Sequence, residues 1–249
     1  HLHSFPTRRS SDLTALNIKG LTATQIKQLD ADQLGNLPVA AIRGLLSTQV
    51  AEIAGDKLPV AFLNLLPAAG VKGLTTTQIS QLTKEQVESF TTANIKGLTT
   101  AQIEAFGAGT ATDQPSWIEV ADIAAMTPQQ VAKLKVASLS ADQITALSVA
   151  NVKGLTATQL KDMTAAQILG LDAADIRVLT SVQVAGIDAA DVSIALIENV
   201  SAAAVRGLTT QISGLSQDGI LAFSTTNIKG LTPTQIGMLD RKSTRLNSS

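Results

Sequence analysis

The residues best suited to chemistry in this chain are closely spaced carboxylates and a recurring cation. Three pairs of aspartates have a spacing that could bind calcium or serve as acid and base: Asp30 with Asp32, Asp172 with Asp175, and Asp188 with Asp191. No EF-hand loop surrounds any of them. Each pair falls where a short helix would begin, so we interpret these carboxylates as helix caps and partners of the helix dipole.

The cations recur near the end of every third repeat unit, and they are candidates for a polyanion-binding row: Lys19, Arg43, Lys72, Lys96, Lys153, Arg177, Arg206 and Lys229. The functional hypothesis is a strip that binds a polyanion, such as an acidic polysaccharide, through several cations at once. The structural alternative is that each cation stabilises a helix C-terminus and covers apolar surface with its alkyl stem. The structural interpretation is favoured.

The two ends of the chain resemble translated sequencing adapters. Residues 240–249 read back as GAT CGG AAG AGC ACA CGT CTG AAC TCC AGT, and residues 3–13 resemble the opposite adapter. We therefore expect residues 1–13 and 240–249 to be artefactual tails and residues 14–239 to form a single repeat segment. Both histidines, His1 and His3, lie in the first tail.

The composition of residues 14–239 excludes several classes of site. It contains no His, Cys or Tyr, which removes imidazole and thiolate metal ligands and His- or Cys-based nucleophiles. With 14 Lys and Arg against 18 Asp and Glu, its net charge of −4 gives no nucleic-acid signature. No phosphate-binding loop and no apolar run long enough to span a bilayer occurs. The sequence predicts no enzyme, no cofactor and no metal.

The elements that position these residues follow an eight-residue repeat. Leu21-Thr-Ala-Thr-Gln-Ile-Lys-Gln is followed by similar octads from Leu29 and Leu37. Each octad has an apolar residue, then Thr, Ser or Asp, two small residues, Gln, Asn or Asp, and Ile, Val or Leu. The phase returns at Leu74, Leu82, Phe90, Leu98 and Phe106 and again at Leu147, Leu155, Met163, Leu171, Leu179 and Ile187.

The octad pattern predicts a short helix with its own start and stop. Thr, Ser or Asp followed three residues later by Gln is a capping box, and the flanking apolar residues form a hydrophobic staple. Pro128 and Pro233 fall on the first helical position, where proline is tolerated. A closing glycine, as at Gly20, Gly97, Gly154 and Gly230, is expected to adopt the left-handed conformation that ends a helix.

A longer period is superimposed on the octad. The motif Asn/Ala-Ile/Val-Lys/Arg-Gly-Leu marks every third octad, which predicts a coil of 24 residues. Three intervals have 13 residues in place of eight, so we expect one lengthened helix or loop in a 53-residue higher repeat. Residues 107–117 read as a protruding loop, in which Trp117 is either an exposed contact residue or the loop's anchor.

These patterns predict an all-α solenoid, because so short a helix must be stabilised by its neighbours. A β-solenoid is disfavoured by the lack of alternating hydrophobicity and by the abundance of Ala and Gln. More than half of the chain should be helical, in helices mostly of five to nine residues. The two apolar positions of each octad should be buried, as in Leu21, Ile26, Leu98, Ile103, Leu155, Leu160, Leu231 and Ile236, whereas residues 1–12 and 241–249 should pack on nothing.

The runs Leu21-Thr-Ala-Thr-Gln-Ile and Leu98-Thr-Thr-Ala-Gln-Ile resemble Leu-Thr-x-x-Gln-Ile/Val arrays in large repetitive, haemagglutinin-like or adhesin-like proteins exported by Gram-negative bacteria. The resemblance covers nearly all of residues 14–239 and carries no catalytic or binding residue. It implies a non-catalytic spacer or adhesive stalk at the cell surface or outside the cell, packed between flanking repeats of the same chain. The alternatives are a helical scaffold that binds a protein surface or an anionic polysaccharide, and a linker array beside an enzymatic domain.

Overall fold

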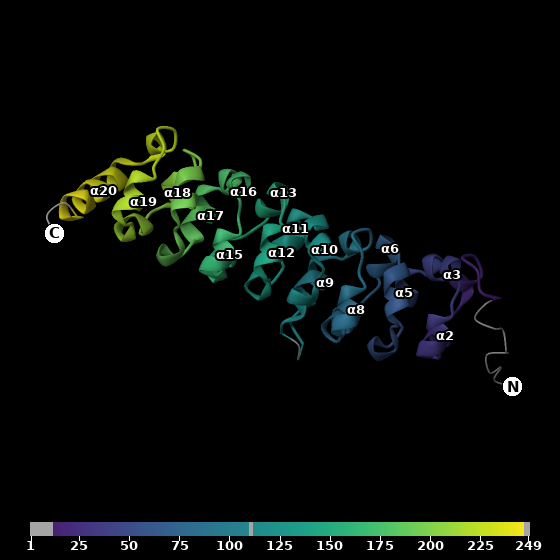
Figure 1. Ribbon diagram of the computed structural model, residues 1–249. Helices are drawn as coiled ribbons and strands as arrows, with labels where there is room; N and C mark the ends of the chain where they lie inside the picture. Colours follow the sequence, from purple (N-terminus) through teal and green to yellow (C-terminus); the bar gives the residue numbers. More distant parts are fainter. Residues whose placement is uncertain (1–11, 110–111, 247–249) are drawn as a thin grey trace. The chain divides into compact units, whose positions relative to one another are not determined.

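The structure, a computed structural model, describes residues 12–109 and 112–246. Of these residues, 61% are helical and none is in a strand, so the predicted all-α class is confirmed. Figure 1 shows short helices joined by brief connections along the chain. The α-helices α1–α19 have five or six residues each, within the predicted range, except for α4, α6, α11 and α13, which have four and fall below it. The last helix, α20 (Pro233–Leu246), has 14.

The chain divides into two compact units. The first contains His1–Met126 and Lys133–Ser138, and the second contains Thr127–Ala132 and Leu139–Ser249. In each unit, helices from successive coils contact one another and form three stacks. A coil therefore supplies one short element to each stack, and an element inside a stack packs between the coils before and after it.

The first unit contains three stacks, in each of which successive elements contact one another. The first stack consists of α1 (Ala23–Lys27), α4 (Ser47–Val50), α6 (Ala68–Val71), η4 (Ile95–Gly97) and α10 (Val120–Ala125). The second consists of η2 (Ile18–Gly20), α3 (Val39–Gly44), α5 (Val60–Leu65), α8 (Lys84–Glu88), η5 (Gln114–Trp117) and η6 (Val136–Ser138). The third consists of η3 (Gly55–Lys57), α7 (Thr76–Ser80) and α9 (Thr100–Ala105), while α2 (Ala31–Gly35) contacts α5.

The second unit is built in the same way. Its first stack consists of α11 (Pro128–Val131), α13 (Val149–Val152), α16 (Ala173–Val178), α18 (Ile194–Asn199) and α19 (Gln217–Leu221). The second consists of α14 (Ala157–Asp162), α17 (Ser181–Gly186), η8 (Val205–Gly207) and η10 (Ile228–Gly230). The third consists of α12 (Ala141–Thr145), α15 (Ala165–Leu169), η7 (Ala189–Asp191), η9 (Gln211–Gly214) and α20.

The predicted capping boxes start most of the α-helices. In α9 the hydroxyl of Thr99 accepts from the backbone N–H of Gln102 at 3.3 Å, and the Gln102 carbonyl oxygen Oε1 accepts from the Thr99 N–H at 2.7 Å. The same reciprocal pair occurs with Thr, Ser or Asp at the cap of α1, α2, α7, α8, α11–α17. Local hydrogen bonds thus define where these helices begin, whereas α3, α5, α6 and α10 have no side-chain cap bond.

The 13-residue intervals are built differently from the prediction of a lengthened helix or loop. Each divides into a five-residue step, which forms a 3₁₀ turn (η3, η6 or η7), and an ordinary octad. A coil that contains such a pentad is shorter: α1 and α4 begin 24 residues apart, whereas the next pair in that stack, α4 and α6, begin 21 apart. The pentad also moves the following octads onto a different stack.

The closing glycines do not adopt the left-handed conformation. Among the residues that the structure describes, only Gly107 has a positive φ, of 77°. The expectation for Gly20, Gly97, Gly154 and Gly230 was therefore wrong. Three of them are needed for close packing, because an ideal Cβ at Gly97, Gly154 or Gly230 would lie well under 3.0 Å from backbone atoms of the coil below. Gly20 has no such neighbour.

The core consists of the two apolar positions of each octad. Ile26, Leu98, Ile103, Leu155, Leu160 and Leu231 are buried as predicted. The prediction fails at both ends of the described chain: Leu21 is only half-buried, and Ile236 is 53% exposed. These two residues lie in the outermost coils, where one side of the coil has no neighbouring coil to cover it.

The two tails differ from expectation where the structure describes them. Residues 1–11 and 247–249 lie outside the described residues. Asp12 is exposed, but α20 continues past Leu239 through Leu246 because no helix-breaking residue follows. None of residues 241–244 is buried, yet Arg241 and Lys242 line a hollow with residues of η9, so they do not project freely.

Candidate functional site

A recurring side-chain amide links each coil to the coil below it. The NH₂ group of the Gln or Asn at the fifth octad position donates to one or more backbone carbonyls about 28 residues earlier, and in most coils the amide oxygen takes part in the capping box. The exceptions are Gln114, whose oxygen bonds to Gly107, and Gln211 and Asn227, whose oxygens are buried without a hydrogen-bond partner. We call these contacts interlayer amide bonds. Donors with such bonds in the first unit include Gln49, Gln78, Gln86, Asn94, Gln102 and Gln114, and those in the second include Gln159, Gln167, Gln183, Gln211, Asn227 and Gln235.

Gln102 shows the geometry. Its Nε2 donates to the carbonyl of Val71 at 2.8 Å and to that of Leu74, while its Oε1 accepts from the Thr99 N–H. The side chain is only 3% exposed. A buried amide whose donors and acceptor are all used satisfies its own polar atoms. It also gives a partner to the Leu74 carbonyl and a second one to the Val71 carbonyl, which already accepts from the Leu74 N–H. One side chain therefore caps its own helix and joins two coils.

The 107–117 segment is anchored by the same device. Gln114 is fully buried, and its Nε2 donates to the carbonyls of Ile79 and Leu82 at 3.2 and 2.8 Å. Its Oε1 accepts from the N–H of Gly107 at 2.9 Å, across the segment. Trp117 is only partly buried, at the end of η5. The anchor of this segment is therefore Gln114, which the sequence did not single out.

All eight residues of the predicted cation row are exposed, but the contacts bring them together as four pairs. The members of a pair lie on, or directly after, contacting elements of one stack: Lys19 with Arg43, Lys72 with Lys96, Lys153 with Arg177, and Arg206 with Lys229. The first two pairs do not share a stack, because α3 packs on α5 whereas α6 packs on α4. The reason is the pentad at η3, which shifts the octads that follow it.

Two of these cations also bond to the next coil. The Nη2 of Arg177 donates to the side-chain oxygen of Asn199 at 3.1 Å, and the Nε of Arg206 donates to the carbonyl of Gly230 at 3.1 Å. Both bonds give these arginines a structural contact with the next coil, which is a different contact from the predicted one with their own helix C-terminus. Exposed lysines such as Lys72 and Lys96 remain available to an anionic partner.

The aspartate pairs are mainly structural. Asp30 and Asp172 cap α2 and α16, and Asp175 completes the capping box of α16. Asp188 makes no side-chain cap bond, because it precedes the three-residue turn η7 and not an α-helix. The cap interpretation was therefore wrong for Asp188. No group of acidic residues or histidines in the described ranges has the arrangement of a metal site.

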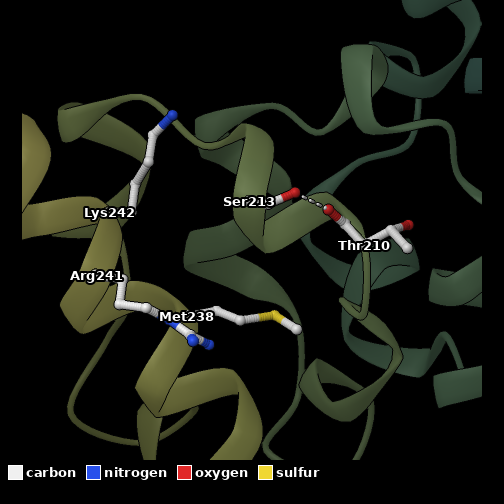
Figure 2. A pocket seen from close by; sticks show the side chains of 5 residues that line it. All are labelled: Thr210, Ser213, Met238, Arg241 and Lys242. Atoms are coloured by element: carbon white, nitrogen blue, oxygen red, sulfur yellow. Dashed lines mark hydrogen bonds between the residues drawn. The ribbon is translucent and has the colours of Figure 1, made fainter.

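A hollow of about 410 Å³ lies between η9 and α20 in the second unit. Figure 2 shows Thr210 and Ser213 on one side and Met238, Arg241 and Lys242 on the other, with the Ser213 hydroxyl donating to the Thr210 carbonyl at 2.7 Å. The five lining residues include no acid or imidazole, so no general base stands beside either hydroxyl.

None of the helices in residues 12–109 and 112–246 is both long and apolar enough to cross a membrane. The chain matches no protein-family model and no curated protein sequence.

Proposed function

We propose that this chain is a non-catalytic structural segment, a spacer or adhesive stalk within a large exported bacterial protein. The observation that carries the proposal is the interlayer amide bond, which recurs from coil to coil in both units. Since each coil is bonded and packed mainly to its two neighbours, coils can be added without redesign of the core. The resemblance to repetitive surface proteins agrees with such a role.

A spacer should resist tension coil by coil, and stretching a single molecule by its ends tests this. We expect unfolding in small steps, each releasing one or two coils, because contacts are mostly between neighbours. A fully extended coil of 24 residues spans about 80 Å, so steps near that length or twice it are expected. Rupture of the whole chain in one event at low force would contradict the proposal.

A second candidate function is binding of an anionic polysaccharide, and the exposed pairs of cations favour it. Neighbouring cations on contacting elements can engage one polymer together, and the affinity should fall as salt rises. Lys72→Gln with Lys96→Gln removes one such pair. The matched control, Lys27→Gln with Lys161→Gln, removes the same charge from the same octad position outside the pairs.

We expect the Lys72/Lys96 variant to bind heparin about fivefold more weakly, since exposed ion pairs contribute up to about 1 kcal/mol each. The Lys27/Lys161 variant should bind like the original chain. Affinity can be measured by titration at two salt concentrations. Equal binding by all three proteins would eliminate this candidate and leave the spacer proposal intact.

A further inference from the structure

Asp122 occupies a position where other coils place an amide donor. It is the fifth residue of its octad, in α10, and its side chain is 2% exposed. One coil below in the same stack, Asn94 donates from Nδ2 to the carbonyls of Leu63 and Leu66 at 3.0 and 3.3 Å. Asp122 has a carboxyl group there, and its Oδ2 is buried without a hydrogen-bond partner.

The register of the interlayer amide bonds identifies what this carboxyl group faces. Gln114, eight residues before Asp122, bonds to the carbonyls of Ile79 and Leu82. Moving both partners by one octad places the Asp122 carboxyl over the carbonyls of Val87 and Phe90. An ionised carboxylate can only accept hydrogen bonds, whereas the protonated acid can donate one to a carbonyl.

We propose that Asp122 is a proton-dependent link between coils: it joins α10 to the coil below when its carboxyl is protonated and releases it when ionised. The buried, unpartnered Oδ2 and the amide at the equivalent position of the coil below carry this inference. Its consequence is an interlayer contact that tightens in mildly acidic surroundings.

Asp175 in α16 has the same octad position and is 3% exposed. Gln183, eight residues later, bonds to the carbonyls of Val152 and Leu155, so the register places Asp175 over Ile144 and Leu147. Its Oδ2 accepts from the Asp172 N–H at 3.4 Å, so this carboxyl, unlike that of Asp122, already has one long hydrogen bond. The second unit therefore contains a related, partly satisfied acid.

The electrostatic surroundings favour the protonated form of both acids. Burial first, and then the negative charge of Glu119, raise the pKa of Asp122 to about 6. Burial and the charge of Asp172 also raise the pKa of Asp175. For Asp122, the other charged groups on the elements concerned are Lys96 on η4, and Glu85 and the Lys84–Glu88 ion pair on α8. For Asp175 they are Arg177 on its own helix, Lys153 at the C-cap of α13, Asp142 on α12 and Glu198 on α18.

The sign of the pH effect follows from the raised pKa of the folded state. The stabilisation is complete below the pKa of the unfolded chain, near 4, and is lost as pH rises through about 6. The link should therefore weaken between pH 5 and pH 8. Ionisation of Asp122 alone should make the unfolding equilibrium constant about tenfold larger at pH 8 than at pH 5.

Urea unfolding of the full chain at pH 5 and pH 8 tests the link. Asp122→Asn supplies a donor at every pH, so the tenfold rise in the unfolding equilibrium constant between pH 5 and pH 8 that is due to Asp122 should be absent from this variant. The variant should also be more stable than the original chain at pH 8. Asp142→Asn is the control, since Asp142 is an exposed first-turn aspartate of α12, and it should behave like the original chain.

Asp122→Ala provides a second variant. It removes the carboxyl without supplying a donor, so it should also lose the tenfold pH effect while remaining less stable than Asp122→Asn. If Asp122→Asn and Asp122→Ala retain the pH dependence of the original chain, or if Asp122→Asn is less stable than the original chain at pH 8, the proposal is overturned. Neither outcome depends on whether the chain is a spacer or binds polysaccharide.

Discussion

Gly97→Ala is expected to destabilise the protein by about 3 kcal/mol, the cost of forcing a packed backbone apart. A Cβ at this position would overlap the Ala68 carbonyl and Cα in α6, one coil below. These are backbone atoms and cannot rotate away as a side chain would. Urea unfolding followed by circular dichroism measures the change. Gly154→Ala, which meets the backbone of Pro128 in the second unit, should have a similar effect.

Gly20→Ala is the matched control, because Gly20 closes the same motif but a Cβ added to it would have nothing within 4 Å. Its stability should change by less than about 0.5 kcal/mol. If Gly20→Ala and Gly97→Ala cost the same, the glycines are retained for their backbone conformation and not for close approach between coils.

Gln102→Met is expected to lower stability by about 2–4 kcal/mol. Methionine has a similar length but removes the donors to the Val71 and Leu74 carbonyls and the acceptor for the Thr99 N–H. Buried polar groups left without partners cost about 1–3 kcal/mol each, partly relieved by relaxation. The loss can be measured by urea unfolding, and local hydrogen exchange should rise in α9 and in residues 71–74.

Gln25→Met separates the two roles of the amide. Gln25 forms the capping box with Thr22 but makes no bond to an earlier coil, and it is not fully buried. Loss of the cap alone should cost less than about 1 kcal/mol. A cost at Gln25 equal to that at Gln102 would mean that the interlayer amide bonds contribute little.

Local features of this fold could be predicted from the sequence because local interactions determine them. The capping boxes follow from residues three apart, as in Thr99 and Gln102, and the apolar octad positions follow from the spacing of Leu98 and Ile103. The stacking register could not be predicted in the same way. It depends on contacts between coils, and a pentad such as the one that forms η3 shifts those contacts.

The sequence contains one signal of the interlayer amide bonds, the repeated amide side chain at the fifth octad position. A capping box accepts Glu as readily as Gln, yet the fifth octad position repeatedly holds an amide, as in Gln49, Gln78 and Gln102. An amide can donate to a buried carbonyl at any pH, whereas an ionised Glu carboxylate can only accept. The preference for Gln over Glu therefore indicated a second role, whose partners, such as Leu74 for Gln102, became apparent only in three dimensions.

The most direct test of coil-to-coil bonding is to detect one interlayer amide bond in solution. Nuclear magnetic resonance can measure scalar coupling across a hydrogen bond, between the Nε2 of Gln102 and the carbonyl carbons of Val71 and Leu74 in isotope-labelled protein. We expect both couplings, with the side-chain NH₂ protected from exchange with water. The stacked arrangement would be contradicted if the Gln102 side chain shows no coupling to either carbonyl and its NH₂ group exchanges with water as fast as a surface amide.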